Sequence, residues 1–169
     1  MPKAVRLAVL VNPANAATAE PTLRDVQEAA PTIGLKTQIL NATTIGEIDA
    51  AFATLAHERP DALLVVPDAF FYSRRGQFAT LTAVNKIPAA YWDRDIVAAG
   101  GLMSYGADIA DAVRQVGVYT GKILKGAKPA DLPVLQTTKF EFAINLQTAR
   151  ALGIEVPQAV LSIADEVIE

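Results

Sequence analysis

Short apolar runs alternate with longer amphipathic segments along most of this chain, and this alternation restricts its fold more than any other feature. The first run, residues 4–11, is apolar apart from Arg6 and rich in Val and Leu, as is typical of a parallel strand buried on both faces. Further strands are predicted at 35–40, 62–66, 87–91 and 102–104. Strands separated by helices predict an α/β fold with a Rossmann-like, mostly parallel sheet and helices on both faces.

The segments between these runs have the apolar spacing of helices. Helices are predicted over about 18–33, 44–58, 73–85 and 93–99. Pro31 lies near the end of the first, so we expect its last turn to bend or to be loop. Thr44 followed by Glu47 matches a capping box at the start of the second.

Beyond Gly106 the pattern changes. Residues 108–125 predict one long amphipathic helix. Residues 138–144 alternate, with Phe140, Phe142 and Ile144 on one face, and this period of two predicts a strand whose other face is wetter. A short helix at 146–152, a helical turn at 157–161 and an acidic tail at 164–169 are predicted to follow.

Composition excludes several classes of protein. The 169 residues include 15 Lys and Arg against 18 Asp and Glu, a net charge of −3 with no basic run, which argues against a nucleic-acid partner. The absence of cysteine excludes disulfides and thiolate metal sites. No apolar run approaches the roughly 20 residues that a membrane-spanning helix needs.

Because Met1-Pro2-Lys3 leads straight into a predicted strand, we expect no export signal in this chain.

Polar and aromatic residues directly follow several predicted strands. Ligands of open parallel sheets bind beyond the carboxyl ends of the strands, so these residues are candidates for a small-molecule site. Amides and hydroxyls can bind a carboxylate or amine, aromatic rings can stack, and Asp68 or Asp93 can pair with an ammonium group. Each candidate can also be interpreted as a turn, cap or core residue. The predicted ligand-binding residues are Asn12, Asn15, Asn41, Asp68, Phe70, Phe71, Tyr91, Trp92, Ser104 and Tyr105.

The sequence offers little for catalysis. His57 is the one histidine and lies late in a predicted helix, at the edge away from these candidates, which argues against a zinc site or a Ser/His/Asp triad. Asn12 and Pro13 stand where a dinucleotide-binding glycine motif would follow the first strand. We therefore predict a protein that is not an enzyme and binds no cofactor or metal. An enzyme using Asp68 or Asp93 as acid or base is the remaining alternative.

Several stretches of the chain together resemble one protein family. They are Val11-Asn12-Pro13, Asp61-Ala62-Leu63-Leu64-Val65, Gly100-Gly101-Leu102-Met103-Ser104-Tyr105-Gly106, residues 122–133, and Ala164-Asp165-Glu166-Val167-Ile168. From Arg6 to Glu169 the chain resembles the ABC transporter substrate-binding proteins. The fold of that family is similar to the type I periplasmic binding proteins, which are two-lobed, and the resemblance is to the second lobe only.

The resemblance implies a receptor that captures a small solute outside the membrane and delivers it to an ABC permease. Members of the family include binders of aromatic amino acids, so the implied ligand is a small molecule such as an amino acid, with an aromatic one as the narrower expectation. A periplasmic or extracytoplasmic location is implied in the same way.

We expect this chain to differ from the family in two ways that affect its domain organisation. We expect the first lobe and the export signal to be absent from this chain. Residues 1–106 are then expected to form the ligand-binding lobe, and 107–169 a crossover helix, a strand and a tail that pack on the same lobe or on a partner chain. Packing on a partner would make the protein a homodimer. The alternative function is a stand-alone Rossmann-like regulatory domain that binds a small effector as a dimer.

Overall fold

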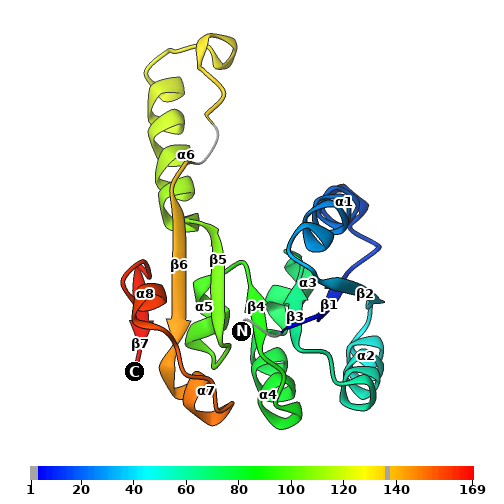
Figure 1. Ribbon diagram of the computed structural model, residues 1–169. Coiled ribbons are helices and arrows are strands. Elements are labelled where there is room, and N and C mark those ends of the chain that lie inside the picture. Colours follow the sequence, from blue (N-terminus) through cyan, green and yellow to red (C-terminus); the bar gives the residue numbers. More distant parts are fainter. Residues whose placement is uncertain (1–3, 136–137) are drawn as a thin grey trace.

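In the computed structural model, which describes residues 4–135 and 138–169, the strands form one sheet with helices on both sides (Figure 1). The strands are β1 (Arg6–Val11), β2 (Lys36–Asn41), β3 (Ala62–Val65), β4 (Ala89–Tyr91), β5 (Met103–Ala107), β6 (Phe140–Asn145) and β7 (Glu166–Ile168). Their order across the sheet is β2-β1-β3-β4-β5-β6-β7. The stretch Met1-Pro2-Lys3 lies outside the described residues.

The sheet is parallel from β2 through β5, which confirms the predicted α/β class with a mostly parallel sheet. β6 then runs antiparallel to β5, and β7 runs parallel to β6. The acidic composition of the tail did not predict β7. It forms because its backbone continues the hydrogen-bonded ladder, with Ile144 opposite Val167.

The helices largely follow the predicted segments. They are α1 (Ala16–Thr32), α2 (Ile45–Glu58), α3 (Ala69–Ser73), α4 (Arg75–Asn85), α5 (Arg94–Ala98), α6 (Ile109–Leu124), α7 (Leu146–Ala151) and α8 (Gln158–Leu161), with a 3-10 turn at Pro129–Asp131. The helix predicted at 73–85 begins earlier, as two helices, because the Asp68 carboxylate caps α3 by accepting a hydrogen bond from Phe71 N at 3.1 Å. α1 continues through Pro31 rather than giving way to loop there.

The capping box at α2 forms only in part. The Thr44 hydroxyl accepts a hydrogen bond from Glu47 N at 3.3 Å, as predicted. The Glu47 carboxylate, however, accepts its short hydrogen bonds from the backbone N–H and the hydroxyl of Thr43, at 2.6 and 2.7 Å, and the N–H of Thr44 contributes less. Thr43 supplies two donors, its N–H and its hydroxyl, whereas Thr44 supplies only its N–H.

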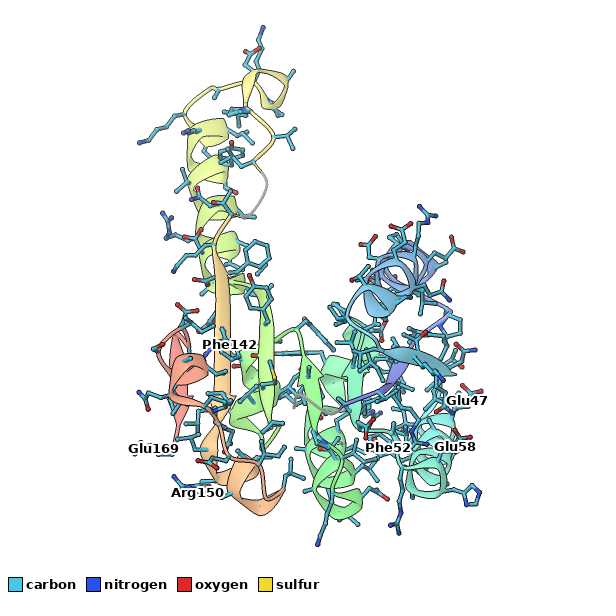
Figure 2. The ribbon with its side chains drawn as sticks, in the orientation of Figure 1. Glu47, Phe52, Glu58, Phe142, Arg150 and Glu169 are labelled. Atoms are coloured by element: carbon cyan, nitrogen blue, oxygen red, sulfur yellow. The ribbon has the colours of Figure 1, made fainter. Side chains whose placement is uncertain are left out.

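Both faces of the central strands are buried because helices cover both. Successive side chains of a strand point to opposite faces, so Leu10 joins one core cluster while its neighbours Val9 and Val11 join the other. Phe52 of α2 lies on the side of its helix that faces the sheet and is 2% exposed (Figure 2). This two-sided burial explains why the first run is apolar without a break from Leu7 to Val11 rather than alternating.

The β5–β6 ribbon carries α6 away from the sheet (Figure 1). β5 extends to Ala107, beyond its predicted end at Ser104, and pairs along that length with β6. None of the residues of α6 is buried. Phe140 was predicted to share a dry face with Phe142 and Ile144, but it is 51% exposed because it lies at the outer end of the ribbon, opposite Ala107.

Candidate functional site

A pocket of about 450 Å³ lies where β4 and β5 end. One wall is formed by Tyr72 of α3 and by the turn from β4 into α5, which contributes Trp92, Asp93, Arg94 and Asp95. The other wall is formed by the end of β5, the first turns of α6 with Asp108, Ile109 and Val113, and Glu141 of β6. We call this the edge pocket. It occupies the carboxyl edge of the parallel strands, where sheets of this class bind ligands.

Hydrogen bonds fix the first wall of the edge pocket. The Tyr72 hydroxyl donates to Asp95 Oδ2 at 2.7 Å, which links α3 to α5. This hydrogen bond to a carboxylate raises the pKa of Tyr72. Asp93 caps α5 by accepting a hydrogen bond from Asp95 N at 2.8 Å. Trp92, which precedes this cap, is half-buried and packs against the core cluster that contains Leu10.

The two walls of the edge pocket meet where Gly106 contacts the backbone of Trp92. A Cβ atom at Gly106 would lie 1.9 Å from the Trp92 carbonyl oxygen and 2.9 Å from its carbonyl carbon. Carbon and oxygen cannot approach so closely, so only glycine allows the outgoing β5 to pass the β4–α5 turn at this distance. Gly106, the last residue of the glycine-rich stretch 100–106, is therefore the one that allows the two walls of the pocket to meet.

Arg94 ties the edge pocket to the last two strands. Its guanidinium donates two hydrogen bonds of 2.7 Å to Glu166 of β7, and its Nε lies 3.4 Å from Glu141 Oε1. The hydrogen bonds to Glu166 raise the pKa of Arg94. Burial raises the pKa of Glu141, because the Arg94 charge offsets the loss of solvent only in part.

Asp108 occupies the point at which the chain leaves the sheet. Its carboxylate caps α6 by accepting a hydrogen bond from Asp111 N at 2.9 Å, and it accepts another from Lys139 Nζ at 2.6 Å. The Lys139 hydrogen bond lowers the pKa of Asp108. Since Lys139 directly precedes β6, this pair joins the outgoing and returning segments of the ribbon.

A second polar cluster joins the ends of β1 and β3. Asp68 accepts hydrogen bonds from Asn12 Nδ2 and Asn15 Nδ2, each at 3.1 Å, and also caps α3 through Phe71 N. Asn12 and Asp68 are both buried. The predicted candidates Asn12, Asn15 and Asp68 therefore lie together. With three donors, Asp68 is already satisfied inside the protein, and this weakens its interpretation as the partner of a ligand's ammonium group.

The remaining predicted site residues are spread more widely. Trp92 lines the edge pocket, Phe70 is half-buried with Arg74 over its ring at 5.8 Å, and Tyr105 is exposed and stacked on Phe140 with ring centroids 5.6 Å apart. Asn41 is exposed at the end of the edge strand β2, with β1 and β3 between it and β4.

The sequence assigned all ten candidates to one small-molecule site, but of the ten only Trp92 lines the edge pocket, and three more, beyond Asn12 and Asp68, are buried within the fold. Phe71 has no exposed surface and packs edge-on against Phe78, with ring centroids 5.4 Å apart. Tyr91 is buried, its hydroxyl lies 3.5 Å from Thr82 Oγ1, and burial raises its pKa to about 12. Ser104 lies within β5 rather than after it, paired with Tyr91 and Ala143. Near the end of a strand, alternate side chains point into the protein. The order of residues along the chain did not show which of these candidates point inward.

Sequence reasoning missed Arg94, Asp108 and Glu141 as residues of the edge pocket. Arg94 and Asp108 lie at the starts of predicted helices, and neither was named as a candidate. Glu141 was predicted on the wetter face of its strand, and it does line the pocket. The local pattern does not indicate, however, that this strand pairs antiparallel with β5. These residues come together only through the long-range pairing of the ribbon.

The described part of the chain, residues 4–135 and 138–169, contains no group of three or more His, Cys, Asp or Glu arranged to hold a metal ion. Within the same ranges, no helix has both the length and the apolar character needed to cross a lipid bilayer.

Comparison with known proteins gives similarity over the whole chain. The family model for the ABC transporter substrate-binding proteins matches residues 1–168. A conserved domain protein from Vibrio cholerae O1 biovar El Tor is 25% identical with a TM-score of 0.88, over 99% of this chain and 56% of that one. A domain from Streptococcus pneumoniae, solved in complex with L-Trp, is 26% identical with a TM-score of 0.88, over 99% of this chain and 58% of that one.

A third structure supports the fold alone. It is the ligand-free, open form of a substrate-binding protein with adhesive properties from Clostridium difficile, 24% identical with a TM-score of 0.71, over 99% of this chain and 55% of that one. No match is found among curated protein sequences. The chain spans little more than half the length of the solved structures that it matches. From the family match over nearly all of its residues, the chain belongs to the ABC transporter substrate-binding protein family.

Proposed function

We propose that this chain binds an amino acid, with an aromatic side chain as the narrower expectation, and that it acts as the solute-binding component of an ABC importer. The observation that carries the proposal is the edge pocket, whose volume of about 450 Å³ suits a small molecule. Trp92 and Tyr72 offer aromatic surface, and the carboxylates beside them offer acceptors for an amine. The L-Trp complex of the Streptococcus pneumoniae domain supports the same ligand class.

A thermal-shift screen of the twenty common amino acids at millimolar concentrations tests this proposal. A ligand present at about its Kd adds about 0.4 kcal/mol to the free energy of unfolding, or roughly 1–2 °C for a chain of this length. We expect aromatic amino acids to raise the melting temperature and Trp92→Leu to abolish the rise. Val84→Ala, an exposed change on α4, is the matched control and should retain it. A flat response to every amino acid would refute the proposed function.

The permease is the proposed partner, and the pocket is proposed as one side of a ligand cleft. Ligand pockets bury most of the surface of what they hold, and a second lobe would cover the part of a ligand that the edge pocket leaves exposed. The proposed division of the chain keeps 1–106 as the ligand-binding lobe and 107–169 as a segment that packs on the same lobe or on a partner chain. We expect weak, millimolar affinity for this chain by itself, since it spans 56–58% of the neighbours' length.

A regulatory domain that binds a small effector as a dimer is the second candidate, and α6 is the observation that favours it. Ile109, Val113, Val116 and Leu124 are 53%, 65%, 66% and 82% exposed, an apolar stripe at helical spacing. Light scattering after size exclusion separates the two candidates. A dimer that Val116→Lys converts to a monomer supports the second candidate, and a monomer at high concentration eliminates it.

A further inference from the structure

The charge of the edge pocket is unbalanced. Asp93, Asp95, Asp108 and Glu141 line it against one guanidinium, that of Arg94. Arg94 directs its Nε and one terminal nitrogen at Glu166, which does not line the pocket. Arg94 also lies 3.4 Å from Glu141 Oε1 and 3.6 Å from Asp95 Oδ1, and Lys139 pairs with Asp108. Two cationic groups thus face the four carboxylates of the pocket and Glu166, so the pocket keeps a net negative charge.

The carboxylates of the edge pocket differ in how far protein groups satisfy them. Asp95 accepts the Tyr72 hydroxyl, and Asp108 accepts Lys139 Nζ and a backbone N–H. Asp93 uses one oxygen, Oδ1, to cap α5. Glu141 has its closest cationic contact at 3.4 Å, and burial raises its pKa. Among the described residues, Asp93 and Glu141 thus retain the most acceptor capacity towards the pocket.

Apolar residues also line the pocket beside these two carboxylates. Trp92 precedes Asp93, and Ile109 and Val113 of α6 line the same pocket. A carboxylate beside apolar surface is stabilised by a bound ammonium group more than one in free water is, because fewer water dipoles compete for it. The site therefore combines an acceptor for a cation with surface for a ring or an alkyl chain.

We propose that the edge pocket selects ligands that carry a protonated amine, with the ammonium group bound by Asp93 and Glu141 and the apolar body against Trp92. This inference rests on the proposed function and narrows it. The amine is the required group, and a ligand carboxylate contributes little at this pocket. A ligand with an aromatic body but only a carboxylate would place a second negative charge among four carboxylates, and it is rejected.

Three phenyl compounds test the selectivity through the fluorescence of Trp92, the one tryptophan of the chain. They are 2-phenylethylamine, L-phenylalanine and 3-phenylpropionate, which share the ring and differ in their charged groups. None contains an indole, so the signal reports Trp92 alone. We expect the two amines to give saturable changes and 3-phenylpropionate to bind at least about tenfold more weakly, a difference of about 1.4 kcal/mol.

Two variants test the residues. Glu141→Gln removes one charge and should weaken 2-phenylethylamine binding about tenfold. Asp93→Asn removes the other charge but retains a residue that caps helices well, so it tests the proposal even if Glu141→Gln does not fold. Glu155→Gln, at an exposed carboxylate outside the pocket, is the matched control and should bind like the parent.

The outcomes separate the inference from the proposed function. Equal binding of 3-phenylpropionate and 2-phenylethylamine, or unchanged amine binding in both folded variants, overturns the amine selectivity while leaving an aromatic-ligand site in place. If neither these compounds nor any amino acid binds, the proposed function fails and the selectivity fails with it.

Discussion

Replacing Gly106 with alanine tests whether the contact between β5 and the β4–α5 turn organises the edge pocket. The new Cβ would lie 1.9 Å from the Trp92 carbonyl oxygen, about half of an ordinary carbon–oxygen contact, and the obstacle is backbone rather than a flexible side chain. Relief therefore requires the turn or the ribbon to move. Overpacking of this kind costs about 1–3 kcal/mol. For a chain of this length that corresponds to a fall in melting temperature of roughly 2–10 °C.

Thermal unfolding followed by circular dichroism measures the effect, and a glycine on α6 provides the control. A Cβ at Gly117 meets nothing within 4 Å, and this residue lies inside a helix. Gly117→Ala should therefore stabilise the protein by about 0.5–1 kcal/mol, because alanine is the better helix former. Since the movement displaces Trp92, Gly106→Ala should also weaken ligand binding. If Gly106→Ala melts at the parent temperature and binds normally, the close approach does not organise the pocket.

Two further predictions concern residues outside the pocket. Asp68→Ala removes the acceptor shared by Asn12, Asn15 and the Phe71 N–H, so urea unfolding should show a loss of about 2–4 kcal/mol, and an unchanged midpoint would contradict the role assigned to this cluster. The backbone N–H groups of Val5 and Arg6 lower the pKa of Asp61. The ionised Asp61 carboxylate therefore stabilises the fold at pH values above the pKa of Asp61 in the unfolded chain, and this contribution is lost as pH falls through its lower pKa in the folded protein. Asp61→Asn should flatten the acid side of the stability–pH curve. A curve of unchanged shape in the variant would rule this out.

Local sequence predicted the elements whose signals are local. The apolar run ending at Val11 predicted a strand buried on both faces, and it forms β1, which lies between β2 and β3 and contributes to both core clusters. The short helix predicted at 146–152 forms as α7, and the Asn145 side chain caps it by accepting a hydrogen bond from Thr148 N at 2.9 Å. Such features depend on the spacing of a few neighbouring residues, which the sequence displays directly.

The candidate site was predicted less completely than the fold. The rule that ligands bind at the carboxyl ends of strands predicted a site at the edge where Trp92 lines a pocket, and that this pocket binds a ligand stays a prediction. It could not tell which side chains at that edge point inward, so Phe71 and Tyr91 were assigned to the site although both are buried. Their burial depends on packing against α4, which is separate in sequence and becomes adjacent only in the folded domain.

The sequence by itself determined the alternation of strands and helices, the class of the sheet and the edge at which polar residues gather, because these follow from local periodicity and from the direction of parallel strands. Only the tertiary structure decided that β6 returns antiparallel beside β5 and brings Glu141 to the pocket. It also decided that Gly106 passes against the Trp92 carbonyl and that Arg94 pairs with Glu166. Each of these joins residues tens of positions apart or on separate elements, and such contacts depend on packing of the whole chain rather than on the pattern of any one segment.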